Sequence, residues 1–180
     1  FHESCEVKQV TSERFAGKAI HKAHPNLRGA GSLKFCNLTE LEPCNVLFLC
    51  LPHGQTAERF DNFSTLAPRI IDLSADFRLS DPESYTKWYG QPHPNPGLLD
   101  RFVYGVPEIN RAAIQDATHV ACAGCNATAS TLALAPLANR NLISSVVIDV
   151  KAGSSEAGNA ATEGSHHPER SGAVRSYRPT

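Results

Sequence analysis

Short apolar strands alternate with helical segments along most of this 180-residue chain, and that alternation restricts the fold more than any other feature. Strand patterns occupy residues 7–11, 46–51, 70–73, 119–123 and 145–150, and helical patterns occupy residues 56–66 and 126–138. The near-continuous apolar run at 46–51 is typical of a strand that is buried on both faces. Strands that alternate with helices predict a parallel, doubly wound α/β sheet.

Two stretches depart from this rhythm. Residues 81–105 carry several prolines, which predicts an irregular surface segment with one or two helical turns around residues 83–89. Residues 151–170 are rich in Gly, Ser, Ala and His and contain almost no large apolar side chain. A long loop of that kind in a compact chain is usually functional or mobile.

Composition excludes several classes of protein. A net charge of −1 with 19% charged residues argues against nucleic acid or an anionic membrane as a partner. The longest apolar run is far shorter than the roughly 18 residues that span a bilayer. The six cysteines lie mostly in or beside apolar strands, which predicts reduced thiols and a cytoplasmic protein. Because the chain begins at Phe1 and contains no methionine, we expect it to be a fragment.

Polar residues follow the predicted strands directly. In open α/β sheets, ligands bind beyond the carboxyl ends of the strands, so these residues are candidates for a site. They are Ser12, Glu13 and Arg14 after the first strand, Pro52, His53 and Gly54 after the second, Asp72, Ser74, Asp76 and Arg78 around the end of the third, and Cys125 after the fourth.

Cys125 is the strongest candidate for chemistry. Gly124 permits a tight turn out of the strand, and the alanine- and leucine-rich stretch that follows predicts a helix beginning near Cys125. The unpaired N–H groups at a helix N-terminus favour thiolate over thiol, which makes the sulfur a nucleophile. The alternative is that Cys125 is a small structural residue, as we expect for Cys50 and Cys122, which are predicted to be buried.

The first strand end suggests a nucleotide cofactor. An acidic residue at this position of a Rossmann fold favours NAD, whereas a serine with an arginine suits the 2′-phosphate of NADP. Arg14 and Ser12 therefore point to NADP, although Glu13 lies between them. His53 could serve the same cleft or belong to a purely structural Pro-His-Gly turn.

The histidines near the C-terminal end do not form a convincing metal site. His166 and His167 are adjacent and diverge in an extended segment, and no cysteine pair has zinc-ligand spacing. No metal is therefore predicted. Together with Arg170, Arg175 and Arg178, the histidines form a cationic stretch that suits a phosphate or carboxylate, or is simply a solvated loop.

Several motifs together resemble one known family. They are CLPHG (50–54), IDLSADFRL (71–79), YGVPE (104–108) and AGCNATAS (123–130). In this order they resemble the N-acetyl-γ-glutamyl-phosphate reductases of arginine biosynthesis. HPNLRG (24–29), SHHPER (165–170) and VRSYRPT (174–180) look most like the branch that acts on carrier-protein-bound aminoadipyl or glutamyl phosphate, in lysine or arginine biosynthesis.

The resemblance implies a partial, Rossmann-like NADP-binding domain over residues 1–124. Residues 125–180 would begin a mixed α+β catalytic and dimerisation domain. It further implies that a glycine-rich turn precedes Phe1 and that a general acid/base histidine follows Thr180. We expect a homo-oligomer and an acidic carrier protein as a possible partner.

The resemblance also implies the chemistry. The Cys125 thiolate would displace phosphate from the acyl phosphate, and NADPH would reduce the resulting thioester to the semialdehyde. The residues matched to cofactor binding are Ser12, Glu13, Arg14, Pro52 and His53, and those matched to the substrate are Tyr177 and Arg175.

Three alternatives remain open. One is an aspartate-semialdehyde dehydrogenase-like reductase, which uses the same thioester chemistry. Another is a cysteine-dependent hydrolase or acyltransferase with His166 or His167 as the base, which would need no nicotinamide. The last is a binding module without catalytic activity.

Overall fold

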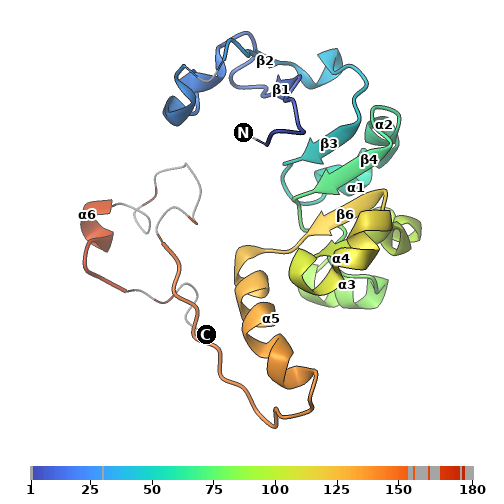
Figure 1. The fold of residues 1–180 in the computed structure, drawn as a ribbon, viewed down its shortest axis with the longest axis vertical. Helices are drawn as coiled ribbons and strands as arrows, with labels where there is room; N and C mark the ends of the chain where they lie inside the picture. Colours follow the sequence, from blue (N-terminus) through green and yellow to red (C-terminus); the bar gives the residue numbers. More distant parts are fainter. Residues whose placement is uncertain are drawn as a thin grey trace. The chain divides into compact units, whose positions relative to one another are not determined.

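The computed structural model of the protein describes residues 2–29, 31–153, 156, 162, 167–174 and 176. The chain divides into two compact units, Phe1–Thr128 and Ala129–Thr180. The elements drawn in Figure 1 are β1 (Val10–Thr11), η1 (Ile20–Lys22), η2 (Pro25–Leu27), β2 (Phe35–Cys36), η3 (Leu38–Glu40), β3 (Val46–Leu49), α1 (Gln55–Glu58), α2 (Phe60–Ser64), β4 (Arg69–Asp72), α3 (Pro82–Tyr89), η4 (Pro96–Arg101), β5 (Phe102–Gly105), α4 (Pro107–Asp116), β6 (His119–Cys122), α5 (Cys125–Ala138) and α6 (His167–Arg170).

The first unit is built on a parallel sheet whose described strands lie in the order β3-β4-β6-β5. Leu49 of β3 is the partner of Asp72 in β4, and Asp72 is in turn the partner of Ala121 in β6. A separate parallel ladder joins β1 to β2. The predicted parallel α/β sheet is confirmed, and its register brings the carboxyl ends of β3, β4 and β6 to one edge.

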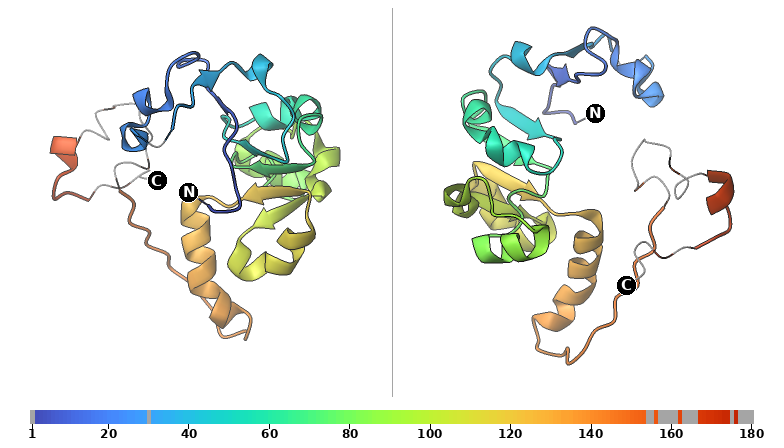
Figure 2. Two further views of the ribbon diagram at one scale, coloured as in Figure 1. Left: turned by 45° about the horizontal axis from the view of Figure 1, so that its top comes forward. Right: turned by 180° about the vertical axis from the view of Figure 1, so that it is seen from behind.

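One face of this sheet is covered and the other is partly open. Helices α1 and α2 lie on the same side of β3 and β4 (Figure 1 and Figure 2). Leu49 of β3 packs with residues of these helices and is buried. Val46 and Phe48 of the same strand are exposed, Phe48 to 61%. The prediction that residues 46–51 are buried on both faces is therefore wrong, because among the described residues only one face of β3, an edge strand, is covered.

The core of the first unit lies between the covered face of the sheet, helix α2 and the segments after β4. Its buried members are Leu49, Ala57, Phe60, Phe63, Ile70, Phe77, Leu98, Leu99 and Ala121. The rings of Phe77 and Phe102 stack with centroids 3.9 Å apart, and Phe60 meets both rings edge-on. This aromatic cluster anchors the segment after β4, which carries the polar residues of the strand edge.

The proline-rich stretch folds more regularly than predicted. Helix α3 confirms the expected helical turns, and its N-cap is Asp81, whose carboxylate accepts hydrogen bonds from the backbone N–H groups of Glu83 and Ser84. Helix α3 ends at Gly90, which has a φ of 76° that few other residues adopt. Strand β5 and helix α4 were not predicted.

The second unit contains most of α5 and a long extended segment. Residues 145–150, predicted as a strand, are described but form none, and Val147 is 98% exposed. Helix α5 includes Pro136 and the predicted helix at 126–138. Among the residues that the structure describes, no helix combines the length and apolar character needed to cross a membrane.

Candidate functional site

The turn after β3 and the loop after β4 are joined through one buried carboxylate, that of Asp76. Its Oδ1 accepts hydrogen bonds from the Gly54 N–H, at 2.6 Å, and lies 2.8 Å from His53 Nδ1. Its Oδ2 accepts the Ala57 N–H at 2.9 Å. Asp76 is completely buried, so this contact fastens the Pro52–Gly54 turn to the adjacent strand end.

A second buried carboxylate, Asp72, lies at the end of β4. It accepts hydrogen bonds from the Ser74 hydroxyl at 2.7 Å and from the Thr56 hydroxyl at 3.2 Å. Burial raises the pKa of Asp72; the hydrogen bonds from Ser74 and Thr56 oppose this increase, and the charge of Asp76 adds to it. Ser74 Oγ also accepts the Asp76 N–H, so the two carboxylates belong to one network.

His53 connects this network to aromatic side chains. Its Nε2 lies 3.2 Å from the Tyr85 hydroxyl, and its ring centroid is 4.5 Å from that of Tyr89. Tyr85 is fully buried, and burial, with the nearby Asp76 charge and Tyr89, raises its pKa to about 12. The Tyr85 hydroxyl therefore keeps its proton throughout the neutral range.

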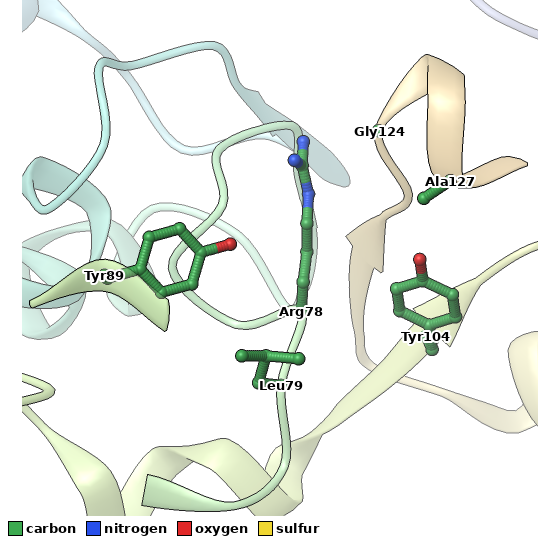
Figure 3. A pocket seen from close by; sticks show the side chains of 6 residues that line it. All are labelled: Arg78, Leu79, Tyr89, Tyr104, Gly124 and Ala127. Atoms are coloured by element: carbon green, nitrogen blue, oxygen red, sulfur yellow. The ribbon is translucent and has the colours of Figure 1, made fainter. Parts of the chain in front are cut away.

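A cavity of about 310 Å³ lies beside these groups in the first unit. Figure 3 shows it between α3, the loop after β4 and the start of α5. Its lining residues are Arg78, Leu79, Tyr89, Tyr104, Gly124 and Ala127. The volume matches the lower end of the range for small-molecule sites.

Arg78 joins the cavity to the strand that precedes Cys125. Its Nε donates to the Cys122 carbonyl at 2.8 Å, and one terminal nitrogen donates to the Leu73 carbonyl at 2.9 Å. A Cβ added to Gly124 would lie 3.2 Å from the other terminal nitrogen. Glycine at position 124 therefore allows the chain to pass close to the guanidinium.

Cys125 lies where the sequence predicts it, at the first residue of α5 directly after β6. Its side chain is exposed. The next turn is held by Thr128, whose N–H and hydroxyl both donate to the Gly124 carbonyl, at 2.8 and 2.9 Å. An exposed sulfur at the start of a helix of this length is accessible to an electrophile.

The neighbouring cysteines differ from Cys125. Partial burial raises the pKa of Cys122, and the charge of Asp72 raises it further, so Cys122 stays a thiol. Cys50 is exposed, and the prediction that it is buried is wrong because it follows the edge strand β3. Of these three cysteines, Cys125 alone begins a helix.

The cofactor residues predicted after the first strand follow β1. The Ser12 hydroxyl accepts the Phe15 N–H, which closes a turn. Glu13 and Arg14 are exposed, and the Arg14 guanidinium lies 5.3 Å from the centre of the Phe15 ring. Pro52 and His53 are at the end of β3, as predicted.

Comparison with known proteins places the chain in a family. Residues 2–117 match the family model described as the NAD-binding domain of semialdehyde dehydrogenase, and residues 125–180 match the one described as its dimerisation domain. The chain belongs to the semialdehyde dehydrogenase family. This agrees with the parallel sheet and with the resemblance inferred from the motifs.

Individual members of the semialdehyde dehydrogenase family match nearly the whole chain. A protein of Thermomicrobium roseum is 52% identical over 99% of this chain. The LysW-L-2-aminoadipate 6-phosphate reductase of Deinococcus radiodurans is 48% identical over 99%, and the LysW-L-2-aminoadipate/LysW-L-glutamate phosphate reductase of Saccharolobus solfataricus is 44% identical over 98%. The aligned region is 51%, 52% and 51% of these three relatives, so the chain spans about half their length.

The two predicted substrate residues, Arg175 and Tyr177, lie outside the described residues, as do His166 and Arg178 of the cationic stretch. Within the described part of the chain, no group of His, Cys, Asp and Glu side chains is arranged to hold a metal ion. The sequence reasoning missed Tyr85 and Tyr89. Their spacing of four residues in a predicted helical turn could have placed them on one face.

Proposed function

We propose that the intact protein is a cytoplasmic, NADPH-dependent reductase of acyl phosphates. Its substrate is the γ-phosphate of glutamate or the 6-phosphate of 2-aminoadipate, linked through the amino group to a LysW-type carrier protein. Its product is the corresponding semialdehyde, with phosphate released. The observation that carries the proposal is the position of Cys125, exposed at the first residue of α5 and next to a cavity at the carboxyl edge of the sheet.

The residues at the strand ends fit a nicotinamide cofactor. Ser12 and Arg14 supply a hydroxyl and an exposed guanidinium after β1, a combination suited to the 2′-phosphate of NADP. The turn at Gly54 is open, since an added Cβ there would meet nothing within 4 Å. When bound, the cofactor supplies the hydride that reduces the acyl group.

Cys125 carries the covalent step. Its thiolate attacks the carbonyl carbon of the acyl phosphate, the carbon–oxygen bond to phosphate breaks, and phosphate leaves with that electron pair. The product is a thioester on Cys125, which accepts hydride more readily than an oxygen ester. After reduction, the sulfur leaves as thiolate and the semialdehyde is released, which restores the starting state.

The remaining features support binding and assembly. The match of residues 125–180 to a dimerisation domain supports a homo-oligomer. The names of the two reductases above support a carrier-linked substrate. The cationic residues after position 165 suit an acidic carrier protein.

The experiment is a comparison of substrates on the intact protein, followed through NADPH absorbance. The substrates are carrier-linked glutamyl or aminoadipyl phosphate, free N-acetylglutamyl phosphate and aspartyl phosphate. We expect the highest kcat/KM with a carrier-linked substrate. Turnover with aspartyl phosphate alone would replace the proposal by an aspartate-semialdehyde dehydrogenase, and acyl-phosphate hydrolysis without NADPH oxidation would replace it by a thiol hydrolase.

A further inference from the structure

The turn Pro52–Gly54 leads into helix α1 but supplies no side-chain cap for it. Gly54 has a φ of 89° and is the N-cap of α1, and it has no side chain with which to cap the helix. The carboxylate of Asp76 takes over that role, because it accepts the N–H groups of Gly54 and Ala57. The cap therefore comes from a residue on the loop after a different strand.

The same carboxylate orients the ring of His53. Asp76 as a carboxylate can only accept hydrogen bonds, so His53 Nδ1, at 2.8 Å, carries a proton. In the neutral ring Nε2 is then the acceptor, and it faces the Tyr85 hydroxyl at 3.2 Å. One tautomer of His53 satisfies both partners.

Asp76 is itself held from its other side. Its backbone carbonyl lies 3.0 Å from His93 Nε2, and His93 Nδ1 accepts the Asn95 N–H. That second contact requires the proton on Nε2, so His93 donates to Asp76. Both His93 and Tyr85 are buried, which fixes the framework around the Asp76 carboxylate.

This framework reaches the cavity through ring contacts. The His53 ring lies against Tyr89, and Tyr89 lines the cavity. Figure 3 shows the Tyr89 hydroxyl pointing toward the Arg78 side of the cavity. A rotation of His53 would therefore change both the turn after β3 and one wall of the cavity.

We propose that Asp76 is a positioning residue for cofactor binding. It sets the tautomer and orientation of His53 and holds the Pro52–Gly54 turn, while remaining buried itself. This inference rests on the proposed function, because it takes the turn to be part of the cofactor site. We expect Asp76 to act on cofactor affinity more than on the chemical step, since the groups that its carboxylate holds are the Gly54 and Ala57 N–H groups and the His53 ring.

The test uses Asp76→Asn in the intact protein, with Asp61→Asn as the matched control, because Asp61 is an exposed residue of α2. The amide of Asn presents a donor where the carboxylate has an acceptor, so it conflicts with one of the three N–H groups. We expect the Kd and KM for NADPH to rise about tenfold, which is the effect of losing one charge-assisted hydrogen bond. The kcat at saturating NADPH should change less than about threefold. Asp61→Asn should leave all three values unchanged.

A double-mutant cycle separates positioning from general destabilisation. In a His53→Ala background, Asp76→Asn should raise the Kd for NADPH less than it does in the wild type, because the part transmitted through His53 is gone. Equal effects in the two backgrounds would overturn the inference, and so would an unchanged Kd in Asp76→Asn. Failure of the wild-type protein to bind NADPH would instead contradict the proposed function.

A second pair of variants applies if Asp76→Asn does not fold, as judged by circular dichroism. His53→Asn places an amide nitrogen near the Nδ1 position and can still donate to Asp76, whereas the longer Gln places its nitrogen near Nε2. We expect His53→Asn to lose less NADPH affinity than His53→Gln. Equal losses would show that the contact with Asp76 does not matter for binding.

Discussion

The sheet region at residues 46–122 and the segment that follows α5, residues 139–153, both contain β-branched apolar runs, yet only the first forms strands. Val46–Leu49 has a parallel partner in β4 and a helical layer on one face. Residues 145–150 are also rich in β-branched apolar side chains, with Ser145 and Asp149 among them, but all six residues are exposed. An apolar run therefore becomes a strand when a neighbouring strand supplies hydrogen bonds and a second layer covers one of its faces.

The two regions should differ most in how much the free energy of unfolding falls when a β-branched side chain is truncated to alanine. Ile70 is completely buried at the centre of the core, whereas Val147 is 98% exposed. Ile70→Ala should lower the free energy of unfolding by about 2–5 kcal/mol, because it leaves a cavity. Val147→Ala should change it by less than about 0.5 kcal/mol.

Denaturant titration of both variants measures this contrast. Equal costs for the two substitutions would contradict the distinction between a packed region and an exposed one. A large cost for Val147→Ala alone would show that residues 145–150 are covered in the intact protein.

A smaller effect tests how tightly the sheet itself is packed. A Cβ added to Gly105 in β5 would lie 2.9 Å from a Val120 methyl and 3.0 Å from the Ala121 carbonyl oxygen, so backbone would have to move. Gly105→Ala should lower the free energy of unfolding by about 1–3 kcal/mol. Gly97→Ala is the control, since an added Cβ there meets nothing within 4 Å. A tolerated Gly105→Ala would mean that β5 and β6 are less closely joined than described.

The smallest effect concerns pH. Burial lowers the pKa of His93, although its hydrogen bond to the Asp76 carbonyl and the Asp76 charge oppose this. The unfolded chain takes up a proton near the ordinary histidine pKa of about 6.5, and the folded protein does so only at a lower pH. The contribution of neutral His93 to the free energy of unfolding is therefore complete above about pH 6.5 and is lost as the pH falls through the lowered pKa.

Urea unfolding between pH 7.5 and pH 5 compares the wild type with His93→Gln, which can still donate to the Asp76 carbonyl. We expect stability to decrease less steeply with falling pH in the variant. Parallel profiles would exclude His93 as a source of acid sensitivity.

The sequence predicts much of the sheet and the position of Cys125, because both depend on local patterns. The run 70–73 matches β4 within one residue, and Gly124 with the alanine- and leucine-rich stretch after Cys125 predicts the start of α5. The strand expected at 145–150 does not form, since a strand also requires a distant partner. The exposed face of β3 was missed for the same reason.

The polar network around Asp76 also depends on contacts between residues distant in sequence, which local patterns do not predict. Asp76, His53 and Tyr85 are separated by many residues in the chain, and only the register of the parallel strands and the fold of α3 bring them together. The sequence could mark Asp76 and His53 as residues after strands. It could not show that one buried carboxylate would cap α1 and orient His53.

The most direct test of the account is semialdehyde formation by the Cys125→Ala variant of the intact protein, with Cys5→Ala as a control at another exposed cysteine. NADPH affinity is measured in the same preparations. We predict that Cys125→Ala loses at least about a thousandfold in kcat while its Kd for NADPH stays within about threefold, and that Cys5→Ala matches the wild type. Retained turnover in Cys125→Ala would contradict the assignment of this residue as the nucleophile.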